Sequence, residues 1–145
     1  MRVYFDASVI IAALLSPSGG SSQLIKYIKG DLIKGITSQT VIEEILEEDK
    51  FEKLRKTKDE ILQFIVQSGL MVVRDVKGEE TDLLKGMIDA EDAHLIVGAN
   101  LTKCDYLVSL DKKHLVQPVT QKRFLPLKIV FPKVLLEEIV KKRNI

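Results

Sequence analysis

Residues 2–10 read RVYFDASVI, and this stretch decides the fold class. RVYF is a short strand pattern that ends at Asp6, and SVIIAALL (8–15) is typical of a buried helix stopped by Pro17. The alternation continues, with strands predicted at 34–38, 70–76, 105–110 and 127–131 and helices between and after them. The sequence therefore predicts an α/β fold, a three-layer α/β/α sandwich with a mostly parallel sheet of about five strands.

Several predicted helices are bounded by residues that cap helix ends. Ser38 is expected to cap one helix, Thr57 with Glu60 forms a capping-box pattern before another, and Ser21 or Ser22 is expected to cap a third. The helices are predicted over 22–29, 39–48, 60–67, 79–87, 90–100 and 133–142.

Composition limits the classes of protein that remain. The 145 residues fit one domain over 1–145, with enough apolar material (46%) for a core. A net charge of +1 means that nucleic-acid binding must use a local patch. A single cysteine, Cys104, excludes an internal disulfide and suits a reducing cytoplasm. No apolar run approaches the roughly 20 residues of a membrane helix, so no membrane partner is expected.

Acidic residues follow two of the predicted strands. Asp6 comes directly after RVYF, and Asp111 follows the strand pattern at 105–110. Either one alone is typical of a turn or a helix cap. Open α/β sheets, however, bind ligands at the carboxyl ends of their strands. Asp89 and Asp92 open a later helix, where negative charge also suits the helix dipole.

Two adjacent glutamates, Glu43 and Glu44, lie in the helix predicted after the second strand. The apolar stripe of that helix is formed by Val41, Ile42, Ile45 and Leu46, and both glutamates are equally far from its centre at about 100° per residue. Helix periodicity therefore leaves the choice between them open.

Four segments together resemble the four motifs of the PIN domain. They are FDASVI (5–10), TSQTVIEEIL (37–46), DAEDAHLIVGA (89–99) and DYLVSLDKKHL (105–115). The resemblance runs from residue 2 to about residue 131 and is to the small stand-alone prokaryotic PIN proteins, which include VapC-type toxin ribonucleases.

The resemblance implies an acidic catalytic and metal-binding set made of Asp6, Glu44, Asp92 and Asp111. Glu44 is preferred over Glu43 by the family spacing alone. One or two Mg²⁺ or Mn²⁺ ions suit this set, because both are hard cations that prefer oxygen ligands.

Further residues match supporting positions. Ser109 fits the hydroxyl position of the fourth motif, and Ser8 stands where many members have Asn. Asp89 is either a fifth acid at the rim or a helix cap. A basic run, Lys112, Lys113 and His114, follows Asp111 and is a candidate for phosphate contact.

The function implied is a metal-dependent endoribonuclease acting on single-stranded RNA in the cytoplasm, as in the toxin of a toxin–antitoxin pair. A homodimer and an antitoxin protein are the implied protein partners, and the apolar last helix suggests an exposed apolar surface for them. The alternative is a PIN-fold nucleic-acid-binding or scaffolding module with little turnover. A phosphatase of similar topology is disfavoured, because its nucleophilic aspartate usually lies in a DxD pattern and the first motif here is DAS.

Overall fold

The computed structural model describes residues 1–47, 53–76 and 78–143, and its centre is a sheet in the order β3-β2-β1-β4-β5. The strands are β1 (Arg2–Phe5), β2 (Lys34–Ser38), β3 (Met71–Val73), β4 (Tyr106–Val108) and β5 (Lys128–Val130). Every neighbouring pair is parallel, which confirms the predicted sheet. The strand order runs outward from β1 in one direction and from β4 in the other. The switch point of the topology, where such sheets place ligands, therefore lies between β1 and β4.

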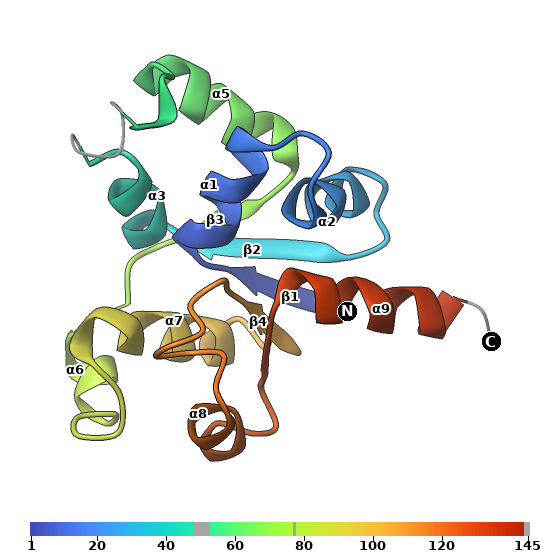
Figure 1. Ribbon diagram of the computed structural model, residues 1–145. Coiled ribbons are helices and arrows are strands. Elements are labelled where there is room, and N and C mark those ends of the chain that lie inside the picture. The colour runs from blue at the N-terminus through green and yellow to red at the C-terminus, as the bar shows by residue number, and fades with distance from the viewer. Residues whose placement is uncertain (48–52, 77, 144–145) are drawn as a thin grey trace.

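Helices cover both faces of the sheet (Figure 1). In that view α1 (Ala7–Leu15), α2 (Gly20–Lys29), α3 (Gln39–Ile45) and α5 (Lys58–Ser68) lie above it. Below it lie α6 (Gly78–Asp82), α7 (Ala90–Leu101) and α8 (Pro118–Arg123). The last helix, α9 (Pro132–Arg143), packs against α2.

The first strand is buried on both faces, which explains its apolar sequence. Val3, Tyr4 and Phe5 are completely shielded from solvent. On one face, α7 approaches so closely that a Cβ atom at Gly98 would lie 2.5 Å from the hydroxyl oxygen of Tyr4. The absence of a side chain at residue 98 therefore sets how near α7, which carries Asp92, can come to β1.

The caps expected for α3 and α5 are present. The Ser38 hydroxyl accepts a hydrogen bond from the Val41 amide at 3.2 Å. Thr57 and Glu60 form the predicted capping box at the start of α5. Residue 48, the last of the helix predicted over 39–48, lies outside the described residues.

The cap predicted for α2 is wrong. This helix begins at Gly20, with Gly19 as its N-cap. The Ser22 hydroxyl instead donates to the carbonyl oxygens of Ala13 (3.0 Å) and Ser16 (2.5 Å). These bonds connect the start of α2 to the end of α1. They also give hydrogen-bond donors to carbonyl groups that have no partner within the last turn of α1.

Two further elements differ from the prediction. The helix expected over 79–87 ends at Asp82 and continues only as turns, and α8 was not predicted.

The last helix also buries more of its apolar stripe than expected, because Leu135 and Ile139 face the core. Val134 and Val140 remain exposed, so the surface that α9 leaves for a partner is smaller than the sequence suggested.

No single helix in the described part of the chain has the length and apolarity needed to span a membrane. The pair α1 and α2, bent by 97° between them, passes that test by length and composition only.

Candidate active site

The first site residue, Asp6, lies where β1 ends and α1 begins. It is the N-cap of α1, and its Oδ1 accepts a hydrogen bond from the Val9 amide at 3.1 Å. The side chain is buried, with 5% of its surface exposed. Phe5 pairs with Val108 in the parallel β1–β4 ladder. Asp6 and the segment that carries Asp111 therefore follow the carboxyl ends of neighbouring strands.

Ser8 connects these two strand ends. Its hydroxyl donates to Asp6 Oδ1 at 2.6 Å and accepts a hydrogen bond from the Leu110 amide at 3.0 Å. Ser109 is fully buried, and its hydroxyl accepts from the Asp111 amide at 3.0 Å. Ser8 therefore contacts the Asp6 carboxylate directly, and Ser109 contacts the backbone that carries Asp111.

Asp92 and Asp111 meet at the same edge of the sheet, together with His114. One ligand atom from each of these three side chains lies within 4.8 Å of the other two. Asp92 arrives from the first turn of α7, and Asp111 from the loop after β4. His114 Nδ1 lies 3.4 Å from Asp111 Oδ2.

Burial and neighbouring negative charge raise the pKa values of two of the aspartates, Asp6 and Asp92. Burial and the charge of Asp111 raise the pKa of Asp92 to about 6. Burial also raises the pKa of Asp6, against hydrogen bonds from Ser109, Ser8 and the Val9 amide that lower it. Asp111 adds a smaller rise to the pKa of Asp6, so its charge acts on both of the other aspartates. A cation that binds among such closely spaced carboxylates reduces the free-energy cost of their negative charge.

Glu44 reaches towards α7, whereas Glu43 is exposed on α3. Glu44 Oε1 lies 3.1 Å from Nε2 of His94, whose side chain is only 12% exposed. Neither ring nitrogen of His94 has a well-aligned hydrogen bond among the described residues. The contact favours Glu44 over Glu43 as the inward-facing glutamate, although Glu44 lies outside the group formed by Asp92, Asp111 and His114.

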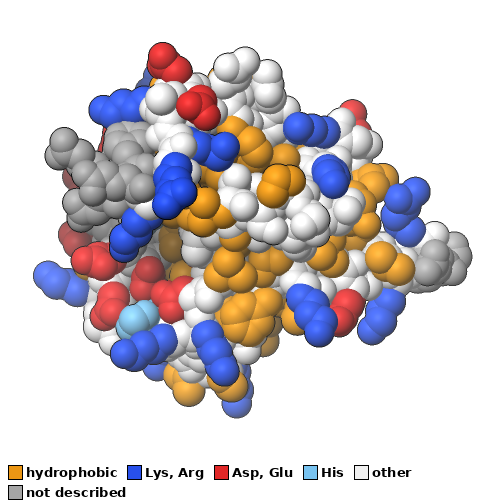
Figure 2. Space-filling model, turned by 45° about the horizontal axis from the view of Figure 1, so that its top comes forward, with side chains coloured by type: hydrophobic (Ala, Val, Ile, Leu, Met, Phe, Trp, Pro, Cys, Tyr) orange, Lys and Arg blue, Asp and Glu red, His pale blue; other side chains and the backbone are white. Residues whose placement is uncertain are grey.

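The remaining predicted residues lie at the rim. Asp89 is an exposed N-cap residue of α7 whose side chain makes no capping bond, and its charge raises the pKa of Asp92 slightly. Lys112 and Lys113 are exposed beside Asp111. Figure 2 shows acidic side chains gathered next to a histidine, with Lys and Arg side chains close by. Although the net charge is only +1, acidic and basic side chains therefore gather together around this site.

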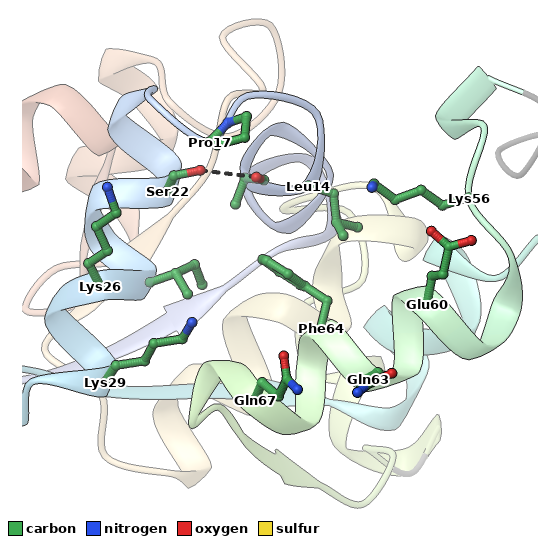
Figure 3. Close-up of a pocket in the computed structure, with 12 residues that line it drawn as sticks. Leu14, Pro17, Ser22, Lys26, Lys29, Lys56, Glu60, Gln63, Phe64 and Gln67 are labelled. Atoms are coloured by element: carbon green, nitrogen blue, oxygen red, sulfur yellow. Dashed lines mark hydrogen bonds between the residues drawn. The ribbon is translucent and has the colours of Figure 1, made fainter.

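A second hollow lies between α1, α2 and α5 (Figure 3). It encloses about 480 Å³ above an apolar floor that includes Leu14 and Phe64. Lys26 and Lys29 line it from α2, and Lys56 lies across from them. Among the described residues that line it, Glu60 is the one acid, and none of the aspartates that follow β1 and β4 takes part.

The strand-end site has the chemistry that a hard divalent cation requires. Asp92 and Asp111 offer carboxylate oxygens, which Mg²⁺ and Mn²⁺ prefer, and Asp6, which lies outside the group of Asp92, Asp111 and His114, adds negative charge nearby. Burial, with the charge of Asp111 added to it, raises the pKa values of Asp6 and Asp92, so a cation bound beside them would offset the cost of their negative charge. These observations fit one or two divalent cations at this edge of the sheet.

Two contacts were missed or misjudged from the sequence. His114 was assigned to a basic run, but it lies in the acid cluster. Its separation of three residues from Asp111 within one turn could have suggested the contact. The contact of His94 with Glu44 joins elements far apart in sequence, and no local signal predicts it.

Comparisons with known proteins agree with this geometry. The family model for the PIN domain matches residues 2–113. No curated protein matches the sequence. Among solved structures, a chain in the crystal structure of VapBC2 from Rickettsia felis bound to a DNA fragment from their promoter superposes with a TM-score of 0.58. Its identity is 16%, over 90% of this chain and 98% of that one, and at this identity the likeness shows the fold alone.

Proposed function

The chain belongs to the PIN-domain family, and from that premise we propose that it is a metal-dependent endoribonuclease that hydrolyses single-stranded RNA in the cytoplasm. The observation that carries the proposal is the meeting of Asp92 and Asp111 beside the buried Asp6 at the switch point of the sheet. PIN domains are generally nucleases, and this chain has an acid in each of the four segments that resemble the family's motifs.

Each acid has a role that its position supports. Asp92 and Asp111 would hold the cation, and Asp6, oriented by Ser8, would complete the negative site. A bound Mg²⁺ or Mn²⁺ would supply Lewis acidity towards the phosphodiester and offset the charge that develops on its oxygens. Glu44, whose Oε1 lies 3.1 Å from Nε2 of His94 on α7, accepts the proton of the attacking water at a carboxylate oxygen.

The overall reaction is hydrolysis of one phosphodiester bond. The water oxygen bonds to phosphorus, the bond from phosphorus to the leaving oxygen breaks, and the leaving oxygen takes up a proton. Lys112 and Lys113, exposed beside Asp111, bind the flanking phosphates. Because the net charge is only +1, binding of RNA depends on such local positive side chains and not on the charge of the whole protein.

A protein partner is also part of the proposal. The matched solved structure contains VapBC2, and by analogy this chain would pair with an antitoxin protein. The homodimer rests on the family resemblance alone. The pocket between α1, α2 and α5, with its apolar floor and lysine rim, suits an acidic amphipathic segment of such a partner. Lys26→Glu with Lys29→Glu should weaken binding of that segment without changing RNA cleavage.

Cleavage of a diverse single-stranded RNA pool tests the activity, with single-stranded DNA of the same sequences alongside. Mn²⁺ or Mg²⁺ should support cleavage and EDTA should stop it.

Glu44→Gln and Asp111→Asn should lower the rate by about 10²-fold or more. Glu43→Gln, at the exposed neighbouring position, is the matched control and should behave as wild type. If Glu43→Gln is as damaging as Glu44→Gln, the assignment of Glu44 fails. Intact RNA that stays bound to the metal-loaded protein would favour the nucleic-acid-binding module instead.

A further inference from the structure

His114 is placed so that it can share a cation with the two aspartates. Its Nδ1 lies 3.4 Å from Asp111 Oδ2, and the ligand atoms of the Asp92, Asp111 and His114 group lie within 4.8 Å of one another. Two ligands at right angles around a cation with bonds of about 2.1 Å are about 3 Å apart, and opposite ligands are about 4.2 Å apart. The separation of 3.4 Å between Nδ1 and Oδ2 already lies between these two values, and the limit of 4.8 Å for the group is only slightly above the larger one.

The loop that carries His114 is fixed by its own backbone. Asp111 Oδ1 accepts hydrogen bonds from the amides of Lys113 (3.1 Å) and His114 (2.9 Å). The carbonyl of Asp111 accepts from the amides of Leu115 and Val116, whose side chains are buried. Because the two amides occupy Oδ1, Oδ2 is the carboxylate oxygen left to face the imidazole.

The side chain of His114 is also accessible. It is 48% exposed, and the carboxylate of Asp111 is 30% exposed, so a hydrated cation can reach both from solvent. The chain contains two histidines, and the other one, His94, contacts Glu44 instead.

We propose that His114 is a direct ligand of the cation through Nδ1, giving a mixed imidazole–carboxylate site that selects Mn²⁺ over Mg²⁺. The proposal deepens the proposed nuclease function and rests on it for the presence of a cation. Imidazole nitrogen is a poor ligand for Mg²⁺, which prefers oxygen, whereas first-row transition ions accept it. An all-carboxylate site would lack this preference. The competing role for His114, contact with an RNA phosphate, requires no bond to the cation.

Pulsed electron paramagnetic resonance of Mn²⁺ bound to the untagged protein tests the ligand directly, because a coordinated imidazole couples its nitrogen nuclei to the metal. Wild type should show this nitrogen coupling, His114→Gln should lose it, and His94→Gln should keep it. Titration calorimetry should give a Kd for Mn²⁺ at least about tenfold weaker in His114→Gln, with less than about threefold change for Mg²⁺.

The outcomes separate this proposal from the function on which it rests. Bound Mn²⁺ without nitrogen coupling in wild type, or coupling that persists in His114→Gln, overturns the ligand assignment and leaves the nuclease proposal standing. Equal losses of Mn²⁺ and Mg²⁺ affinity in His114→Gln overturn the selectivity. A wild-type protein that binds neither ion overturns the ligand assignment together with the metal-dependent function.

Discussion

Asp92→Asn should stabilise the cation-free protein, although it removes a proposed metal ligand. Burial and Asp111 raise the pKa of Asp92 from 3.8 to about 6. At about 1.4 kcal/mol per pKa unit, this corresponds to about 3 kcal/mol against the charged form. Because the group is only partly buried, solvent screening reduces the expected gain to about 1 kcal/mol. For a chain of this length, that gain raises Tm by about 3–5 °C.

The sign of the pH dependence follows from the raised pKa. The folded protein holds the Asp92 proton more tightly than the unfolded chain, so stability falls as pH rises between the two pKa values. The penalty is absent below about pH 4, grows up to about pH 6 and is fully present above it. The gain from Asp92→Asn should therefore be seen at about pH 7.5 and vanish near pH 4.

Thermal unfolding in EDTA, followed by circular dichroism, measures the effect at both pH values. Glu91→Gln is the matched control, because Glu91 is exposed on the same first turn of α7 and has the same relation to the helix dipole. With Mn²⁺ at about 100 times its Kd, wild type should gain about 2.7 kcal/mol and Asp92→Asn much less. If Asp92→Asn is less stable than wild type in EDTA, or gains equally at both pH values, the reasoning is refuted that burial and the charge of Asp111 make ionised Asp92 destabilising.

The remaining predictions concern binding and packing around the same acids. Mn²⁺ affinity should fall by up to about tenfold per pH unit below about pH 6, because protonation of Asp92 competes with the cation; calorimetry that shows a flat profile would contradict this. Ser8→Ala should weaken Mn²⁺ binding about tenfold by releasing Asp6, whereas Ser8→Thr, which keeps the hydroxyl, should not. Gly98→Ala should cost about 2 kcal/mol, because the new Cβ would lie 2.5 Å from the Tyr4 hydroxyl. An unchanged urea midpoint would exclude that clash.

The sheet and two of its acids could be predicted because their signals are local. Strands covered on both faces have short apolar sequences, and Asp6 follows such a strand directly. The six-residue α8, PVTQKR, buries only Thr120, so no apolar periodicity marked it. The prediction for 79–87 failed from residue 83 onward: α6 ends at Asp82, and the turns that follow include Gly86, whose positive φ of 84° a helix does not allow.

The contacts within the site could not be predicted from the sequence, because they depend on tertiary structure. Glu43 and Glu44 are equivalent with respect to their own helix, and only the approach of His94 from α7 distinguishes them. His114 looked like part of a charged loop because its neighbours are two lysines. The turn at Asp111 leaves those lysines exposed, whereas it places the imidazole of His114 next to the acids.

The hydrogen bond between Ser8 and the Leu110 amide spans 102 positions in the chain. Asp6, Glu44 and Asp92 are all synthesised before the segment that this bond holds in place. A growing chain therefore carries most of the acids well before β4 can pair with β1 and bring Asp111 to them. Cation binding, and any hydrolysis that depends on it, should thus begin only after the ribosome has released the segment around residue 111 for folding. Chains truncated before β4 should be inactive even where their first three motifs are intact.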